Sequence, residues 1–195
     1  MSRRAVFLDR DGVINRAIVR DGRPFPPACL AELEVLPGVA EALARLREAG
    51  FLRIVVTNQP DVARGTTSRA VVEAMNAHLE ATLPLTEIRV CYHDAGDHCA
   101  CRKPGPGMIL EAARVHDIDL PGSFVVGDRW RDMEAGIRAG CRTIFVDLGY
   151  DEKQPSLCHF RVASLPEAAQ IIISTARGDP PTEIGDETRT ARSRI

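Results

Sequence analysis

Two aspartates stand two residues apart where an apolar run gives way to a turn. Asp9 and Asp11 follow the apolar residues 5–8, and Gly12 lets the backbone turn directly after them. A carboxylate in such a place can attack phosphorus while its neighbour transfers a proton. An ordinary Asp-Gly turn after a strand accounts for the same residues equally well. The rest of the sequence must therefore decide between a turn and a site.

Other apolar runs are followed by polar groups of complementary kinds. They are a hydroxyl and an amide, two cations before a proline, and two further carboxylates: Thr57, Asn58, Arg102, Lys103, Asp128 and Asp132. In a doubly wound sheet, ligands bind outside the carboxyl ends of the strands. At one rim these groups would supply a nucleophile, a proton-transfer carboxylate, neutral donors, cations and a metal-binding carboxylate. That set suits phosphoryl transfer.

A second cluster combines three thiols and one imidazole within eleven residues. Its members are Cys91, His93, Cys99 and Cys101. They suffice for a closed tetrahedral zinc site, which would be structural because it leaves no open position. His98 is a rival ligand, and reduced surface thiols are the alternative interpretation. The other three cysteines are isolated from one another in the sequence, and we interpret them as small apolar residues.

Short apolar runs alternate with helical patterns, which predicts βαβ units around a parallel sheet and the α/β class. The expected strands cover residues 5–8, 53–57, 88–91, 123–127 and 143–146. The expected helices cover residues 37–49, 68–83, 107–116, 132–139 and 165–175. In the first helix, Val39, Leu43 and Leu46 share one face. Pro37 suits its first turn and Gly50 its C-terminal cap.

Length and composition indicate one globular domain. The chain has 195 residues, of which 45% are hydrophobic and 27% charged. We expect the domain to cover residues 1–176. Residues 177–195 are expected to form a disordered tail, because they carry too little apolar surface to offset the entropy of ordering. Residues 16–36, with three prolines, are expected to form an irregular functional loop.

Charge and termini narrow the choice of partners. The net charge of -2 provides no basic excess for nucleic acid. The apolar run after Met1–Arg4 is too short for a signal-peptide core or a membrane span. The clustered cysteines suggest a reducing compartment. We therefore expect a cytoplasmic protein that binds neither nucleic acid nor membrane; the sequence leaves the oligomeric state open, and we favour a monomer.

The order of these motifs resembles the haloacid dehalogenase-like (HAD) phosphatases, subfamily IIIA, across residues 5–150. Four segments carry the resemblance: Asp9-Arg10-Asp11-Gly12, Thr57-Asn58-Gln59, Ala63-Arg64-Gly65 and Cys101-Arg102-Lys103-Pro104. They are similar to the branch that contains the D-glycero-D-manno-heptose 1,7-bisphosphate 7-phosphatases and the histidinol-phosphate phosphatases. The resemblance implies a capless Rossmann-like sheet flanked by helices, with a small zinc-binding loop. Of the two activities we prefer the heptose bisphosphatase.

The resemblance also implies roles for the acidic residues. Asp9 would attack phosphorus, and Asp11 would protonate the leaving oxygen before activating water. Mg²⁺ would be held by Asp9, Asp128 and the backbone carbonyl of Asp11. Asp132 would support the metal shell.

Substrate contacts follow from the same resemblance. Thr57, Asn58 and Lys103 would bind the transferring phosphoryl oxygens. Arg64 and Arg102 would grip the rest of a small phosphorylated metabolite, including a second phosphate. The zinc clip would pin the loop that carries residues 102 and 103.

Departures from the family pattern leave the sugar and its anomer open. Pro60-Asp61 follows Gln59 where a Ser-Gly pair is expected, and residues 20–26 border the expected pocket. Another sugar phosphate or histidinol phosphate is an alternative substrate, and a phosphotransferase would use the same intermediate. A zinc-stabilised binding protein without activity would be expected to lack a catalytic group. Every such group is present here.

Overall fold

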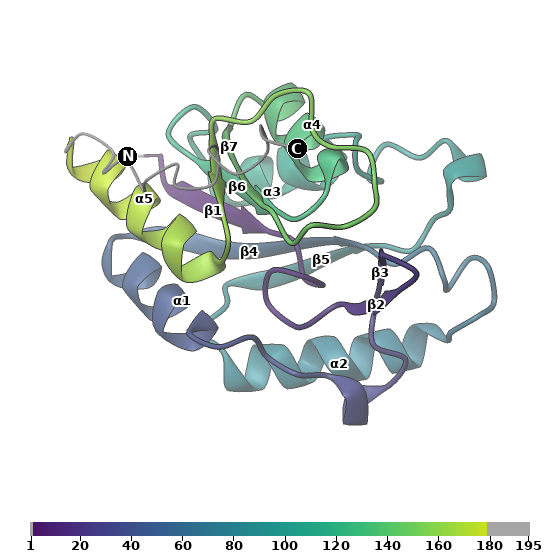
Figure 1. Cartoon of the computed structure of the whole chain (residues 1–195). Coiled ribbons are helices and arrows are strands. Elements are labelled where there is room, and N and C mark those ends of the chain that lie inside the picture. The colour runs from purple at the N-terminus through teal and green to yellow at the C-terminus, as the bar shows by residue number, and fades with distance from the viewer. Residues whose placement is uncertain (1, 179–195) are drawn as a thin grey trace, which may run out of the picture.

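The six strands of the main sheet are all parallel and run in the order β5-β4-β1-β6-β7-β8 in the computed structural model, which describes residues 2–178 (Figure 1). The strands are β1 Arg4–Leu8, β4 Phe51–Asn58, β5 Glu87–Cys91, β6 Phe124–Gly127, β7 Arg142–Val146 and β8 Phe160–Val162. The chain builds β4 and β5 on one side of β1, then β6 to β8 on the other. The carboxyl end of β1 is therefore the switch point at which such sheets bind ligands.

Helices cover both faces of the sheet, so alternate residues of β1 enter different cores. Val6 and Leu8 pack in the cluster that contains residues of α1 Val39–Glu48, α2 Arg69–Thr82 and α5 Leu165–Arg177. Ala5 and Phe7 pack in the cluster with α3 Gly107–His116 and α4 Trp130–Ala139. Burial on both faces explains why the central strands are continuous apolar runs. The predicted α/β class is confirmed.

The predicted elements match the observed ones, with small shifts at their ends. Helix α1 begins at Val39 after Gly38, whose φ is +74°. Pro37 precedes that cap, so its predicted place in the first turn was wrong. Gly50, with φ +83°, directly follows the C-cap residue and serves the predicted C-terminal role. Helix α4 begins two residues earlier than predicted because the Asp132 side chain accepts the backbone N–H of Arg129 at 3.0 Å.

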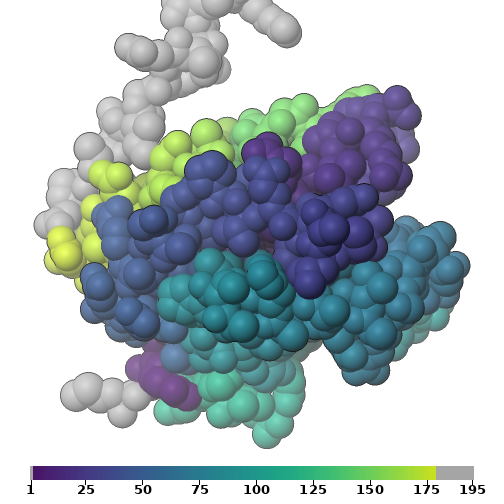
Figure 2. Space-filling model, turned by 90° about the horizontal axis from the view of Figure 1, so that it is seen from below, coloured from purple at the N-terminus to yellow at the C-terminus, as the bar shows by residue number. Residues whose placement is uncertain are grey.

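The predicted irregular loop over residues 16–36 contains regular structure, so that prediction was wrong. Strands β2 Ile18–Arg20 and β3 Arg23–Phe25 form an antiparallel hairpin. Its turn residues Asp21 and Gly22 have φ of +48° and +73°, as a two-residue hairpin turn requires. The 3-10 helix η1 Leu30–Glu32 then packs beside α2, where residues 26–50 (blue) border the teal helix (Figure 2).

The remaining elements are small. Outside the sheet and its five helices, residues 2–178 contain the β2–β3 hairpin, η1 and a second 3-10 helix, η2 Ala95–Asp97. This agrees with the predicted capless form. Across residues 2–178, the structure contains no helix with the length and hydropathy needed to cross a membrane. The predicted tail, apart from its first two residues, lies outside the described residues.

Candidate active site

The carboxyl ends of β1, β4 and β6 meet at one rim and open into a cavity of about 300 Å³. Acids, arginines and the β2–β3 hairpin surround it. Its lining includes Asp9, Asp11, Arg23, Pro24, Phe25, Thr57, Asn58, Pro60, Asp61, Arg64, Arg102, Lys103, Asp128, Arg129, Arg131, Asp132 and Glu152. All the predicted catalytic and phosphate-binding residues therefore line one cavity. The two segments that depart from the family pattern, residues 20–26 and 60–61, also contribute to the wall of this cavity.

Three buried carboxylates form the floor of this cavity. Asp9, Asp128 and Asp132 each offer an oxygen within 4.8 Å of the others. Two glycines leave the space that these carboxylates need to approach one another. A Cβ on Gly127 would lie 2.2 Å from the Cβ of Asp132, and one on Gly12 would lie 2.0 Å from Oδ2 of Asp128. A side chain at either glycine would therefore displace a carboxylate of the group.

Lys103 reaches the same floor from the loop that precedes α3. Its Nζ lies 2.9 Å from Asp9 Oδ1 and 2.5 Å from Asp132 Oδ1, and it donates to the carbonyl of Val56 at 2.7 Å. Burial alone would lower the pKa of Lys103, but the charges of Asp132 and Asp9 outweigh it and raise that pKa above its ordinary value. The lysine therefore remains a cation.

The floor has the donor set and the charge for a divalent cation. Both carboxylate oxygens of Asp128 are buried and have no hydrogen-bond partner among the described residues. Burial, together with the charges of Asp9 and Asp132, raises the pKa of Asp128. When ionised, three carboxylates and one ammonium leave two negative charges. A hard divalent ion that prefers oxygen ligands, such as Mg²⁺, would satisfy the unpartnered oxygens and neutralise that charge.

Asp11 stands beside this floor and is held by a dense set of donors. Arg10, which is fully buried, donates to Asp11 Oδ1 from Nε at 3.2 Å and to both carboxylate oxygens from Nη2 at 3.1 Å. Asn15 Nδ2 donates to Oδ1 at 3.0 Å. Gln59 Nε2 donates to Oδ2 at 2.8 Å. These donors orient Asp11 without using the three-acid group.

Two of these donors connect Asp11 to other elements. Gln59 also donates to the Thr57 hydroxyl at 3.0 Å. Arg10 Nη1 donates to Asn76 Oδ1 on α2 at 2.9 Å. Sequence reasoning assigned no role to Arg10, Asn15, Gln59 or Asn76. Arg10 and Gln59 lay inside quoted motifs, but nothing local showed that their polar groups are buried.

The predicted phosphoryl-binding residues are brought together, although Asn58 also has a structural task. Its side-chain amide donates to the carbonyl of Lys103 at 3.0 Å, and its Oδ1 accepts the backbone N–H of Lys103 at 3.1 Å. This reciprocal pair ties the end of β4 to the lysine loop. Asn58 therefore positions Lys103.

The two arginines predicted to hold the rest of the substrate differ in their pairing. Arg64 donates to both carboxylate oxygens of Asp94, at 2.7 and 2.9 Å, and lies 3.3 Å from Asp61. The hydrogen bonds from Arg64, followed by the backbone N–H of Ala95, lower the pKa of Asp94 to about 2. Arg102 donates to the carbonyl of His93 at 2.9 Å and lies 3.8 Å from Asp94. The positive charge of Arg64 is thus already neutralised by Asp94 and Asp61.

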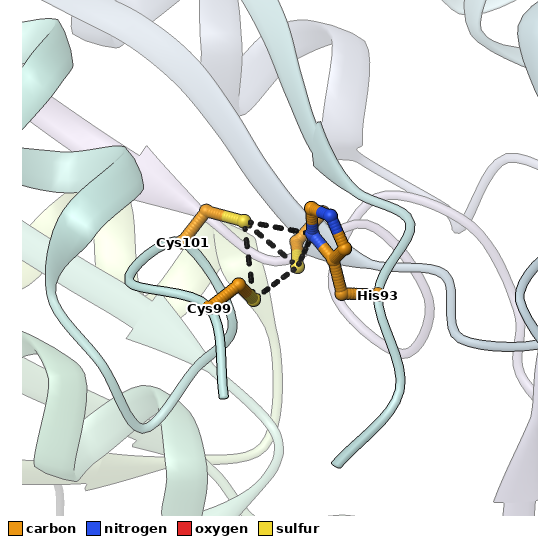
Figure 3. A group of neighbouring side chains, drawn as sticks. His93, Cys99 and Cys101 are labelled. Carbon is orange, nitrogen blue, oxygen red and sulfur yellow. Dashed lines mark hydrogen bonds between the residues drawn. The ribbon is translucent and has the colours of Figure 1, made fainter. Parts of the chain in front are cut away.

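The predicted zinc ligands converge just beyond β5 (Figure 3). The three sulfurs lie 3.1 to 3.7 Å apart, and His93 Nδ1 lies 3.7 Å from Cys91 Sγ and 3.4 Å from Cys101 Sγ. A disulfide would need sulfurs about 2.05 Å apart. A tetrahedron with zinc–sulfur bonds of about 2.3 Å has edges of about 3.8 Å. The geometry suits a structural zinc, and His98 is not among the grouped ligands.

The zinc loop is built against the start of α3. Gly107 donates its N–H to the carbonyl of Ala100 at 3.1 Å, and a Cβ on Gly107 would lie 2.3 Å from that oxygen. Gly105 donates to the carbonyl of Arg102 at 2.8 Å. The loop between these contacts carries Lys103. Fixing the cysteines therefore also restricts the backbone that delivers the lysine.

Comparison with known proteins agrees with this site. Residues 100–164 match the family model described as HAD-hydrolase-like. The D-glycero-beta-D-manno-heptose-1,7-bisphosphate 7-phosphatase of Bordetella bronchiseptica is 38% identical over 153 residues, which cover 76% of this chain and 83% of that protein. The chain belongs to this HAD-like phosphatase family. The predicted resemblance to the heptose bisphosphatases is confirmed.

Other members of the heptose bisphosphatase family support the assignment. The D-glycero-alpha-D-manno-heptose-1,7-bisphosphate 7-phosphatase of Mycobacterium bovis is 40% identical over 139 residues, covering 66% of this chain and 69% of that protein. The crystal structure of the heptose bisphosphate phosphatase from B. bronchiseptica, complexed with magnesium and phosphate, aligns with a TM-score of 0.75 and 32% identity. It covers 88% of this chain and 99% of that one. Magnesium in that relative agrees with the acidic floor described above.

Proposed function

We propose that the protein is a magnesium-dependent phosphatase that removes the 7-phosphate of D-glycero-D-manno-heptose 1,7-bisphosphate. One observation carries the proposal: Asp9, Asp128, Asp132 and Lys103 form a single buried cluster in a chain that belongs to the heptose bisphosphatase family. Relatives named for the beta and the alpha anomer are similarly identical to this chain, at 38% and 40%. The proposal therefore covers both anomers.

In the first step Asp9 is the nucleophile. One of its carboxylate oxygens forms a bond to phosphorus while the bond from phosphorus to the sugar oxygen breaks. Asp11, held by Arg10, Asn15 and Gln59, gives its proton to the departing sugar oxygen. The products of this step are the free hydroxyl and an aspartyl-phosphate.

In the second step Asp11 acts as a base. It takes a proton from a water molecule, whose oxygen attacks the phosphorus and releases Asp9 as a carboxylate. Inorganic phosphate leaves, and Asp11 has regained the proton it donated earlier.

Charge stabilisation accompanies both steps. Lys103, kept cationic by Asp9 and Asp132, places an ammonium group beside the reacting carboxylate. Mg²⁺ bound by Asp9 and Asp128, with Asp132 beside them, would offset the negative charge of the phosphoryl oxygens that repels an incoming carboxylate. The Asp11 carbonyl remains a predicted additional ligand. Zinc held by the three cysteines and His93 would have a structural task only.

The test is phosphate release with magnesium from a panel of substrates. The panel contains both anomers of the heptose bisphosphate, histidinol phosphate and fructose 6-phosphate. We expect the heptose compounds to give the highest kcat/KM and Asp9→Asn to abolish release. Asp117→Asn is the matched control, because Asp117 is exposed at the end of α3 and has the left-handed backbone that asparagine also tolerates.

Any of three results would change the assignment. Release from histidinol phosphate alone would keep the chemistry and replace the substrate. No release from any substrate, with magnesium and zinc bound, would favour a binding protein. Transfer of phosphate to an added alcohol in preference to water would indicate a phosphotransferase.

A further inference from the structure

The connection between β7 and β8, residues 147–159, is anchored beside the acidic floor by three consecutive residues. One of them contacts the β2–β3 hairpin and the other two contact the start of α4. The Asp151 N–H donates to the Gly22 carbonyl at 2.8 Å, Glu152 is paired with Arg129, and Lys153 Nζ lies 4.1 Å from the centre of the Trp130 ring. The residue directly before them, Tyr150, is therefore held by its neighbours on a restricted backbone.

The hydroxyl of Tyr150 approaches the buried carboxylate of Asp128. Both groups face Gly12, because a Cβ on Gly12 would lie 2.0 Å from Asp128 Oδ2 and 3.1 Å from the Tyr150 hydroxyl. The hydroxyl and the carboxylate therefore face the space that the absent side chain of this glycine leaves open. Burial, followed by the negative charge of Asp128, raises the pKa of Tyr150. The hydroxyl thus keeps its proton and can act as a hydrogen-bond donor.

The Asp128 carboxylate lacks the support that a metal ligand usually has. Asp128 is 2% exposed, and neither of its oxygens accepts a fully formed hydrogen bond among residues 2–178. A cavity of about 10 Å³ between Asp128 and Tyr150 has room for one water molecule at most. Arg129 borders the same cavity, but it is paired with Glu152. Tyr150 is therefore the donor best placed to orient this carboxylate.

We propose that Tyr150 is a positioning residue for the magnesium site, and that its hydroxyl donates to the oxygen of Asp128 that does not bind the ion. The inference rests on the proposed function, because it requires Asp128 to be a magnesium ligand. A carboxylate that gives one oxygen to Mg²⁺ leaves the other free to accept a hydrogen bond. A donor at that oxygen fixes the rotation of the ligand and strengthens metal binding. In the described part of the chain, Tyr150 is not among the residues that line the catalytic cavity, so it acts through Asp128 and not on the substrate.

The experiment removes the hydroxyl and keeps the ring. Wild type and Tyr150→Phe, both loaded with zinc, are dialysed against magnesium-free buffer, and the Kd for Mg²⁺ is measured by isothermal titration calorimetry. The same proteins are assayed for phosphate release from heptose 1,7-bisphosphate over a range of magnesium concentrations. Tyr92→Phe is the matched control, because Tyr92 is the other tyrosine of the chain, is also half-buried and contacts Arg69 instead of the acidic floor.

We expect Tyr150→Phe to raise the Kd for Mg²⁺ about 10-fold, as the loss of a group that supports a metal ligand usually does. The magnesium concentration for half-maximal activity should rise by the same factor. Saturating magnesium should restore most of kcat, and KM for the sugar should not change. Tyr92→Phe should bind Mg²⁺ as wild type does. Urea unfolding in magnesium-free buffer reports whether each variant has kept its fold.

Several outcomes would overturn the inference. An unchanged Kd for Mg²⁺ in Tyr150→Phe refutes it, and a lower unfolding midpoint with that unchanged Kd assigns the hydroxyl to packing alone. An equal rise in Kd in Tyr92→Phe also refutes it. A lower kcat/KM at saturating magnesium with unchanged Mg²⁺ binding would place the hydroxyl on the substrate.

The calorimetric readout also separates this inference from the proposed function, because it needs no substrate. If Tyr150→Phe weakens Mg²⁺ binding but wild type releases no phosphate from the heptose compounds, the role of Tyr150 stands and the proposed substrate fails. If wild type releases phosphate and Tyr150→Phe has the wild-type dependence on magnesium, the proposed function stands and the role of Tyr150 fails.

Discussion

The buried contact between Arg10 and Asn76 allows a direct test of how the site is held together. Arg10 is completely buried and Asn76 is 7% exposed. Arg10 Nη1 donates to Asn76 Oδ1 at 2.9 Å, while its other nitrogens hold Asp11. Replacing Asn76 with leucine keeps the number and branching of the side-chain heavy atoms but removes the acceptor. A charged donor would then be buried without a partner.

The expected cost can be worked out from this geometry. Losing a hydrogen bond to a charged group costs about 1.5 to 3 kcal/mol. Leucine is the better helix former by up to about 0.6 kcal/mol, which offsets part of the loss. The free energy of unfolding of Asn76→Leu should therefore fall by about 1 to 2.5 kcal/mol. For a chain of this size that corresponds to a Tm lower by about 2 to 10 °C.

Urea unfolding with magnesium and zinc in fixed excess provides the assay. Asn76→Asp retains an acceptor for Arg10 and should be less destabilised than Asn76→Leu. His78→Leu, at an exposed position of the same helix, should change the unfolding free energy by less than about 0.5 kcal/mol. Because Asn76 lies outside the lining of the catalytic cavity, Asn76→Leu should lower kcat rather than raise KM. An unchanged unfolding midpoint at the same slope would refute the reasoning.

Four further predictions concern the metal loop and the thiols. Cys99→Ser should lose bound zinc and raise KM several-fold by loosening the loop of Lys103; full zinc content by mass spectrometry with unchanged kinetics would contradict this. Gly107→Ala should destabilise by about 1 to 3 kcal/mol in urea, because its Cβ would lie 2.3 Å from a backbone oxygen, whereas Gly96→Ala has open space and should not. Burial raises the pKa of Cys141 to about 12, so iodoacetamide at pH 8.5 should label the exposed Cys29 and spare Cys141 in the native protein. The raised pKa of Cys141 also makes stability depend on pH. Its contribution to the free energy of unfolding is fully present below the unfolded thiol pKa of about 8.5 and should be lost as pH rises towards 12. Cys141→Ala should remove this part of the decrease in unfolding free energy with pH.

Secondary structure was predictable where the signal is local. The strand from Phe51 to Asn58 and the helix from Gly107 to His116 follow directly from apolar runs and helical periodicity. The hairpin was missed although Asp21-Gly22 is a recognised turn pair, because the three prolines of the segment obscured its short strands. Strand β8, with three residues, is too short for alternation to be seen. It depends on pairing with β7.

The amino-acid sequence by itself determined which chemical groups are available and roughly where the strands that carry them end. Asp9, Asn58 and Asp128 could be placed at one rim because parallel neighbouring strands end on the same side. The four zinc ligands could be recognised because they are close along the chain.

Only the tertiary structure decided which polar groups are buried and what each of them contacts. Asn76 is 66 residues from Arg10, and no local pattern shows that they meet. Arg64 and Arg131 are both ordinary arginines in the sequence. One lies between two acids and the other in a cavity wall without an acid partner among the described residues. Burial and charge pairing depend on neighbours that are distant in sequence, which is why the folded chain was needed to distinguish a structural arginine from one free to bind an anion.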